Sequence, residues 1–298
     1  MPVSPVRELF PPEVSSEVID KVKGKSSLAR LSKAEPMPFN GVELFTFDFD
    51  NEASFVGENA AKVPGGTTIG TVTMRPYKVE YSARYSDEFM FASREYRLDV
   101  LRRHSEGFSK KLARALDIGA FHGLNPRSRT ASTVIGDNHF DHDVSQTVTL
   151  TANPSADVES AIALVHGNEL DVTGMAMSPA FRSALAALMN PQTAEPRFPE
   201  LGWGAQPGVL RGLPVDTNST VSFNSSLDRA IIGDFENFFR WGFAKDMFMR
   251  VFDTGNPDND ANAGDLAGHN QILIRTEAYI GWGILLPAAF ARIVASST

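Results

Sequence analysis

Histidine and aspartate alternate over five residues near the middle of the chain. The run is His139-Phe140-Asp141-His142-Asp143. Imidazole nitrogens and carboxylate oxygens are common ligands of zinc and iron in proteins. The spacing matches no hydrolase signature, however, and the flanking residues are typical of a loop. A polar surface loop is the favoured interpretation, and a soluble metal-dependent enzyme that uses these two histidines and two aspartates stays open as an alternative.

A second polar run begins like a calcium-binding loop. Asp258, Asp260 and Asn262 place oxygen-bearing side chains at alternate positions. The glycine that such a loop requires comes one position late, at Gly264, and His269 stands where a bidentate glutamate belongs. We therefore predict a solvated acidic loop over residues 256–264 instead of a calcium site.

Other catalytic signatures are missing from the sequence. The glycine-rich stretch 65–70 lacks the Lys-Ser/Thr pair of a phosphate-binding loop. The chain has no Gly-x-Ser-x-Gly elbow and no cysteine, which excludes disulfides, thiolate metal ligands and a cysteine nucleophile. His104, His122 and His166 are predicted to be structural or surface histidines. We therefore expect no enzyme, no cofactor and no metal.

The composition is that of an ordinary globular protein. The 298 residues include 28 basic and 36 acidic side chains, which leaves a net charge of −8, and 42% of the residues are hydrophobic. This acidic balance argues against broad, non-specific binding of nucleic acid. The opening residues do not have the pattern of a signal peptide, and the longest apolar stretch, 280–291, is too short to cross a bilayer.

Two extended regions are predicted before the first long helix. Six prolines interrupt the first forty residues, so we expect an arm with little to pack against in its own chain. Phe45, Phe47 and Phe49 then alternate with polar residues, and alternate positions over 79–85 repeat the pattern around a Pro-Gly-Gly turn. This indicates a long β-hairpin, which must lie on another surface because a lone hairpin is marginally stable in water.

A long helix and a series of short elements follow. Ser86 is predicted to cap a helix from Asp87 to His122, about 54 Å long, that ends at Gly123. The rest of the pattern predicts helices over 155–166 and 179–189, a buried strand over 175–177, short apolar strands over 213–215 and 230–232, and a closing strand over 271–279.

This order of elements resembles the major capsid protein of tailed bacteriophages, which has the Hong Kong ninety-seven fold. Four local runs carry the resemblance in the right order. Residues 55–64 resemble the family's extended loop, 210–215 its Gly-x-Pro-Val strand, 232–235 its Gly-Asp-Phe turn, and 270–290 its closing strand and C-terminus.

The resemblance implies an α+β fold with four parts. These are an N-terminal arm (1–40), an extended β-hairpin loop (41–85), a peripheral domain with a long spine helix (86–151 and 268–298) and an axial α/β domain (152–267). It further implies a structural protein that self-assembles into an icosahedral shell around double-stranded DNA, without specific DNA binding. An encapsulin-type nanocompartment shell, which holds enzyme cargo, is the alternative with the same fold.

Partners and location also follow from the resemblance. Other copies of the chain in pentamers and hexamers are the main partners expected, together with scaffolding, portal and decoration proteins and no membrane. The virion capsid is the expected location, with assembly in the cytoplasm of a bacterial host. Because Met1 lies close to the arm, we expect scaffolding from a separate protein or none at all.

A self-catalysed crosslink is the chemistry that the resemblance allows. In some relatives a lysine of the extended loop forms an isopeptide bond with an asparagine of a neighbouring peripheral domain, with a glutamate as the base. Lys62, Asn270 and Glu277 stand at the matching positions. The alternative for Lys62 is a salt bridge between subunits, because relatives without crosslinks share the same strand pattern.

Overall fold

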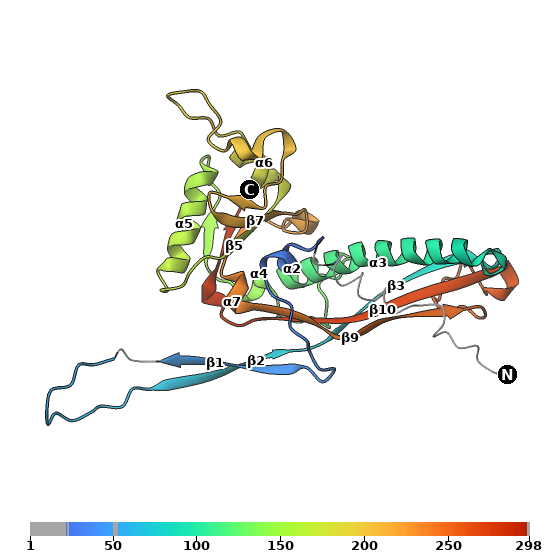
Figure 1. The fold of residues 1–298 in the computed structure, drawn as a ribbon, viewed down its shortest axis with the longest axis horizontal. Coiled ribbons are helices and arrows are strands. Elements are labelled where there is room, and N and C mark those ends of the chain that lie inside the picture. Colours follow the sequence, from blue (N-terminus) through green and yellow to red (C-terminus); the bar gives the residue numbers. More distant parts are fainter. Residues whose placement is uncertain (1–21, 23, 50–52, 297–298) are drawn as a thin grey trace.

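A computed structural model describes residue 22, residues 24–49 and residues 53–296. The described chain forms three separate β-sheets with one long helix, and a two-stranded hairpin projects far from the rest (Figure 1). This mixed helix-and-sheet composition agrees with the predicted α+β class.

The projecting hairpin consists of β1 (Val42–Phe49) and β2 (Thr67–Met74). The strands pair antiparallel without a break, from Val42 opposite Met74 to Phe49 opposite Thr67. The predicted hairpin is therefore present, but the strand over 79–85 is not its second arm.

That strand, β3 (Tyr77–Ser86), belongs to a second sheet with β10 (Gln271–Ile284) and β9 (Phe239–Phe252). The order is β3-β10-β9, and β10 pairs antiparallel with both neighbours. The closing strand was predicted over 271–279 and runs five residues further. The strand β9 was not predicted at all.

The long helix α3 (Arg94–His122) lies along this three-stranded sheet (Figure 1). Its first turn is capped by Ser93, whose hydroxyl accepts a hydrogen bond from the Tyr96 backbone N–H at 3.3 Å. Gly123 ends it in the left-handed conformation, at φ +64°, as a glycine after a helix commonly does. The helix is thus about 43 Å long from the usual rise per residue.

The predicted helix start at Ser86 is wrong for a reason that lies in the sheet. Ser86 is the last residue of β3 and pairs with Gln271. The strand therefore holds Ser86 extended, a short 3-10 helix over Asp87–Phe91 follows, and the α-helix begins only after Ser93.

The third sheet has six strands in the order β4-β11-β8-β5-β7-β6. Their bounds are β4 Thr147–Thr149, β11 Phe290–Val294, β8 Asp228–Gly233, β5 Gly174–Met177, β7 Leu213–Thr217 and β6 Val209–Leu210. Helices α5 (Pro154–His166) and α6 (Pro179–Ala186) share a buried apolar cluster with it, and α6 ends three residues earlier than predicted. The short strands predicted over 175–177, 213–215 and 230–232 are confirmed, and the first of them is buried throughout.

Short helices complete the described chain. They are α4 Phe140–Asp143, α7 Phe235–Phe238, and the 3-10 helices Pro199–Gly204, Phe223–Ser225, Ala267–His269 and Pro287–Ala289. Among the described residues, no helix is long and apolar enough to cross a membrane.

The sheets cross the boundaries that were predicted for the parts of the chain. Strands over 77–86 and 239–252 join the sheet under α3, although they were assigned to the extended loop and the axial domain. Strands over 147–149 and 290–294 join the six-stranded sheet, although they were assigned to the peripheral domain. Which sheet a strand joins depends on pairing between segments that are far apart in the sequence. Local sequence patterns carry no information about such pairing.

The described part of the arm also differs from the prediction, because it packs within its own chain. Helix α2 (Ser27–Leu31) is capped by Ser26, and Leu28 is fully buried in the main core together with Val22. Beyond it, the Glu35 N–H donates to the Trp241 carbonyl of β9 at 2.8 Å. The expectation for residues 1–21 and 23 lies outside the described residues.

Candidate functional site

The projecting hairpin carries an uncovered apolar face. Phe47 lies directly opposite Ile69, and Phe45 is two residues along on the same face. These three side chains are 62%, 61% and 63% exposed. Large apolar side chains grouped on an exposed surface commonly mark a contact with another molecule. The hairpin is therefore the first candidate functional surface.

The loop that joins the two hairpin strands extends this surface. Phe55 and Val63 are 109% and 82% exposed, and Lys62, which precedes Val63, is exposed too. The predicted loop lysine is thus accessible. The loop between β1 and β2, which carries it, forms the end of the hairpin that lies farthest from the body (Figure 1).

The other two residues of the predicted crosslink lie on or beside β10. Asn270 is exposed with a left-handed φ of +51°, just before the strand begins. Glu277 is buried, and its Oε1 lies 2.9 Å from the Lys78 Nζ of β3. Seven residues of extended chain separate them by about 23 Å. One subunit therefore does not bring Lys62, Asn270 and Glu277 together.

The predicted histidine–aspartate run does not converge either. In α4, the His142 Nδ1 contacts the neighbouring Asp143 at 3.0 Å near the surface. The His139 ring packs over Gly123, and burial lowers the pKa of this imidazole. Asp141 is hydrogen-bonded to His122 instead. The four side chains of the run thus share no common ligand centre in this arrangement.

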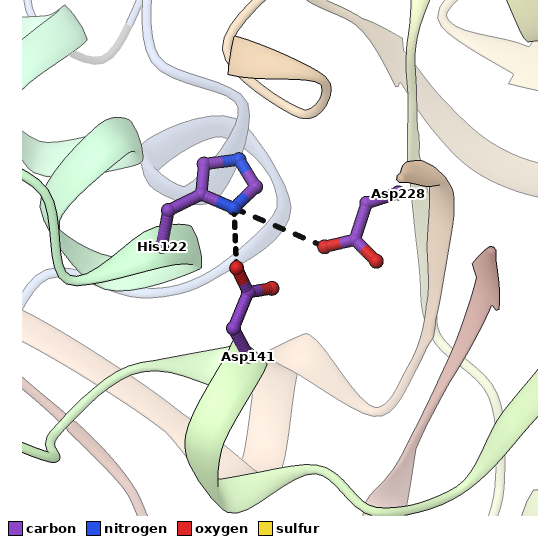
Figure 2. Close-up of side chains that lie close together, drawn as sticks. All are labelled: His122, Asp141 and Asp228. Atoms are coloured by element: carbon purple, nitrogen blue, oxygen red, sulfur yellow. Dashed lines mark hydrogen bonds and ion pairs between the residues drawn. The ribbon is translucent and has the colours of Figure 1, made fainter. Parts of the chain in front are cut away.

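Asp141 instead meets two residues that sequence analysis did not connect with it, His122 at the end of α3 and Asp228 at the start of β8 (Figure 2). The His122 Nδ1 lies 2.8 Å from Asp141 Oδ2 and 3.9 Å from Asp228 Oδ2. The other ring nitrogen, Nε2, donates to the Thr220 carbonyl at 2.9 Å. Both nitrogens face oxygen acceptors, so a doubly protonated imidazolium satisfies both contacts.

Arg292 of β11 completes this group, which we call the joint cluster: His122, Asp141, Asp228 and Arg292. The Arg292 Nη2 lies 2.8 Å from Asp141 Oδ1 and 2.9 Å from Asp228 Oδ1. Two cationic side chains thus face two carboxylates. The cluster links the end of the long helix to the six-stranded sheet.

Burial and close contact shift the pKa values within the joint cluster. Burial, reinforced by Asp141, raises the pKa of Asp228 to about 7. Burial also works to raise the pKa of Asp141, but hydrogen bonds with His122 and Asp228 outweigh it and hold the value at about 2. Burial works to lower the pKa of His122, and the bond to Asp141 turns the net shift upward.

The joint cluster does not fit a metal centre, although three possible ligands lie close together. A metal bound through the His122 Nδ1 would have to displace the proton that this nitrogen shares with Asp141. The guanidinium of Arg292 already supplies positive charge between the two carboxylates. The arrangement fits an ion-pair joint between elements, which is a structural role.

An arginine also occupies the loop that begins like a calcium site. The Arg84 Nε donates to Asp258 at 2.8 Å, and its Nη2 donates to Asn256 at 2.7 Å and to the Gly264 carbonyl at 3.1 Å. The hydrogen bond from Arg84 holds the pKa of Asp258 at about 2. In this loop a cationic side chain, Arg84, contacts oxygen atoms of Asn256, Asp258 and Gly264.

A buried carboxylate of α3 anchors the described end of the arm. Asp117 accepts hydrogen bonds from the Ser27 backbone N–H at 3.0 Å, Asn218 Nδ2 at 3.1 Å and Thr220 Oγ1 at 3.1 Å. Burial raises the pKa of the Asp117 carboxyl to about 6, although hydrogen bonds from donors such as Ser27 and Thr220 act to lower it. Asp117 therefore ties the arm, the long helix and the loop over 218–220 to one point.

Comparison with known proteins gives a family match over nearly the whole chain. A model of the phage capsid family matches residues 8–295. No match was found among the curated proteins.

Solved structures agree with the family match. A chain of Mycobacterium phage Ogopogo is 30% identical at a TM-score of 0.77, with 91% of this chain and 92% of that chain covered. A chain of Gordonia phage Cozz is 22% identical at a TM-score of 0.74, with coverage of 92% and 87%. A capsid chain of an empty GTA particle shares the fold at 14% identity and a TM-score of 0.66, with coverage of 92% and 90%.

Proposed function

The chain belongs to the phage capsid family and is a structural major capsid protein of an icosahedral capsid, and we propose that its copies enclose double-stranded DNA. The uncovered apolar face of the hairpin is the observation that supports assembly of these copies into a shell. Phe45, Phe47 and Ile69 are each more than half exposed. Neighbouring copies in a closed shell supply the surface that the single chain lacks.

The net negative charge of the chain is compatible with a shell that encloses DNA without binding it specifically. A net charge of −8 per subunit gives little electrostatic attraction for DNA phosphates. The proposed shell holds the genome by enclosure and does not bind it specifically. This leaves packaged DNA free to move while it is packed and released.

The proposed assembly involves several kinds of contact. Pentamers and hexamers of the chain form the shell, a portal complex occupies one vertex, and scaffolding and decoration proteins bind during or after assembly. Assembly takes place in the cytoplasm of a bacterial host. These partners rest on family membership and are part of the proposal.

Expression in bacteria followed by sedimentation and negative-stain microscopy tests the main proposal. We expect closed particles of uniform diameter, formed by the chain alone or with the scaffolding protein encoded beside it. A chain that stays a compact monomer under both conditions would contradict the proposal. Particles that carry an enzyme encoded beside the capsid gene, and no DNA, would instead identify an encapsulin-type shell.

A covalent crosslink between subunits is a second element of the proposal. The exposed Lys62 amine of one copy attacks the side-chain amide carbon of Asn270 in another copy, and ammonia leaves as the isopeptide bond forms. Glu277 accepts the lysine proton. Asn270 and Glu277 lie about 23 Å apart along one extended chain, so they serve the same bond only when they come from different copies.

A denaturing gel of mature particles tests the crosslink. We expect a ladder of covalent oligomers from the parent protein and single monomer bands from Lys62→Arg, which keeps the charge. Lys110→Arg, an exposed lysine of α3, is the matched control and keeps the ladder. Monomer bands from the parent would show that Lys62 forms no isopeptide bond.

A further inference from the structure

The side of α3 that faces solvent is basic along the second half of the helix. Its other side shares the main core with the sheet through buried residues such as Phe108 and Leu112. Residues 102–114 hold one acidic side chain, Glu106, and five cationic ones: Arg102, Arg103, Lys110, Lys111 and Arg114. Arg114 is partly buried, and the other four cations are exposed. The positions of Arg103, Lys110 and Arg114 place them in one line along the helix, over about 16 Å.

The line of cations continues into the loop that follows the helix. Arg127 and Arg129 line a groove of about 560 Å³ together with Lys111 and Arg114. The loop over 124–135 contains no acidic residue. We call these seven cations the basic row: Arg102, Arg103, Lys110, Lys111, Arg114, Arg127 and Arg129.

Most of the basic row has no counter-ion within the chain. Arg103 lies 2.9 Å from Asp99, and Arg127 lies 3.4 Å from Glu80. Among the residues that the structure describes, the remaining members form no ion pair; they are Arg102, Lys110, Lys111, Arg114 and Arg129. The chain as a whole has 28 basic against 36 acidic side chains, so the row is a local reversal of its charge. Lysines and arginines grouped along a helix are typical of a surface that meets a polyanion.

A glycine lies in the middle of the basic row. Gly107 is on the exposed side of α3, and a Cβ placed there would meet no atom within 4 Å. Packing within the chain therefore does not require glycine, although glycine is less stable than alanine inside a helix. The missing side chain lets another molecule approach the helix backbone closely between the cations.

The helical part of the basic row fits a DNA duplex better than an acidic protein. None of the large apolar side chains between residues 102 and 114 is exposed. Protein partners commonly bind through apolar and aromatic anchors, whereas phosphates are bound by lysine and arginine alone. A duplex carries one phosphate per about 1.7 Å of its length, so a segment of about 16 Å presents about nine phosphates to the row.

We propose that phosphates of the enclosed double-stranded DNA lie against the basic row, in contacts that do not depend on base sequence. The inference rests on the proposed shell, and it requires the α3 side of the subunit to face the inside. The net charge of −8 is an average over the whole surface, and the row is an exception to it. Contacts to phosphates alone let a duplex slide, so the packaged DNA stays free to move.

Duplex binding by unassembled subunits tests the charge of the row. Lys110→Gln combined with Lys111→Gln removes two exposed cations. We expect the affinity for a short duplex of any sequence, measured by fluorescence anisotropy at low salt, to fall at least about tenfold. The plot of log affinity against log salt should become less steep by about 2, because two phosphate contacts are lost.

A matched variant controls for the change in net charge. Arg197→Gln combined with Arg211→Gln also removes two exposed cations, both outside α3. We expect this control to keep the affinity and the salt dependence of the parent. An equal loss of affinity in the two double variants would overturn the inference, because the basic row would then have no special part in binding.

The absence of cysteine allows the contact to be mapped inside particles. Ser128→Cys places one thiol between Arg127 and Arg129, at an exposed position. The thiol is labelled with the photo-crosslinker azidophenacyl bromide in DNA-filled particles, which are then irradiated. We expect covalent adducts between protein and DNA. Ser183→Cys, the same change at an exposed serine of α6, is the control and gives none.

The outcomes in particles separate this inference from the proposed function. DNA-filled particles that give no adduct at position 128, or equal adducts at positions 128 and 183, overturn the inference and leave the capsid role intact. An adduct of Ser128→Cys with a second protein in place of DNA assigns the row to an acidic protein and overturns the inference too. A parent chain that forms no particles under any condition removes the proposed function, and the inference with it.

Discussion

At the scale of single residues, the joint cluster is a structural feature of the fold. The side chains that resembled a metal site separate, and Asp141 joins His122, Asp228 and Arg292 in the joint cluster. A buried carboxylate left unpaired costs several kcal/mol, so each member of such a cluster depends on the others. We therefore expect the free energy of unfolding to depend on pH through this cluster.

The first prediction concerns Asp228→Asn. Burial raises the pKa of Asp228 to about 7, above the ordinary value of 3.8. The folded chain therefore keeps this proton to a higher pH than the unfolded chain does. The stability from Asp228 is fully present below pH 4 and is lost as pH rises toward 7. Asparagine has the shape of the protonated acid and does not ionise, so the Asp228→Asn variant does not lose this stability as the pH rises.

We expect Asp228→Asn to gain on the order of 2 kcal/mol of unfolding free energy relative to the parent between pH 5.5 and 7.5. Denaturant unfolding of unassembled subunits at several pH values measures it. Asp137→Asn makes the same change at a residue whose side chain is 85% exposed, and it serves as the control. A difference between variant and parent that stays constant with pH would contradict the assignment.

At the scale of elements, backbone contacts hold the arm segment against the edge of the β3-β10-β9 sheet. The Glu35 and Met37 N–H groups donate to carbonyls of Trp241 and Phe243 in β9, at 2.8 and 3.4 Å. A Cβ placed on Gly242 would lie 1.8 Å from the Glu35 carbonyl oxygen. Glycine is required there because two backbones meet, not because of an unusual φ.

The second prediction concerns Gly242→Ala. The added methyl group pushes the segment around Glu35 off β9, and two hydrogen bonds are lost at about 1 kcal/mol each. We expect trypsin to cut after Lys33 at least about tenfold faster, because local opening becomes more frequent. Gly57→Ala, where a Cβ meets open space, is the control. An unchanged cleavage rate would show that the contact does not hold the segment.

At the scale of the whole molecule, stability and assembly use different aromatic residues. Phe140 and Phe290 are fully buried, with ring centroids 5.0 Å apart in the main core. Phe45 and Phe47 lie on the projecting hairpin and face solvent in the single chain. The fold of the single chain therefore does not bury the hairpin aromatics, and we expect that assembly of the shell does.

The third prediction follows from this division. Phe45→Ser with Phe47→Ser should change the unfolding free energy of the subunit by less than about 0.5 kcal/mol. The same variant should raise the concentration needed for assembly by more than about tenfold, because apolar contacts between copies are lost. Phe140→Ala should show the reverse pattern, with a loss of about 3–5 kcal/mol in the subunit itself. Denaturant unfolding and light scattering measure the two quantities. Normal assembly by the hairpin variant would contradict this role.

The sequence by itself determined the features that local patterns control. Alternation in Phe45 and Phe47 predicted β1, Gly123 marked the end of α3, and short apolar runs marked β5, β7 and β8. Four short motifs in order were enough to predict the capsid fold. Each of these signals lies within a few residues, where backbone preferences and side-chain periodicity act.

Tertiary structure alone decided which of these elements meet. Ser86 and Ser93 are both able to cap a helix, and pairing of Ser86 with Gln271 left the role to Ser93. The joint cluster gathers residues from positions 122 to 292, and no local pattern links them. Long-range pairing and burial are set by competition among all surfaces of the chain, so they appear only when the whole chain has folded.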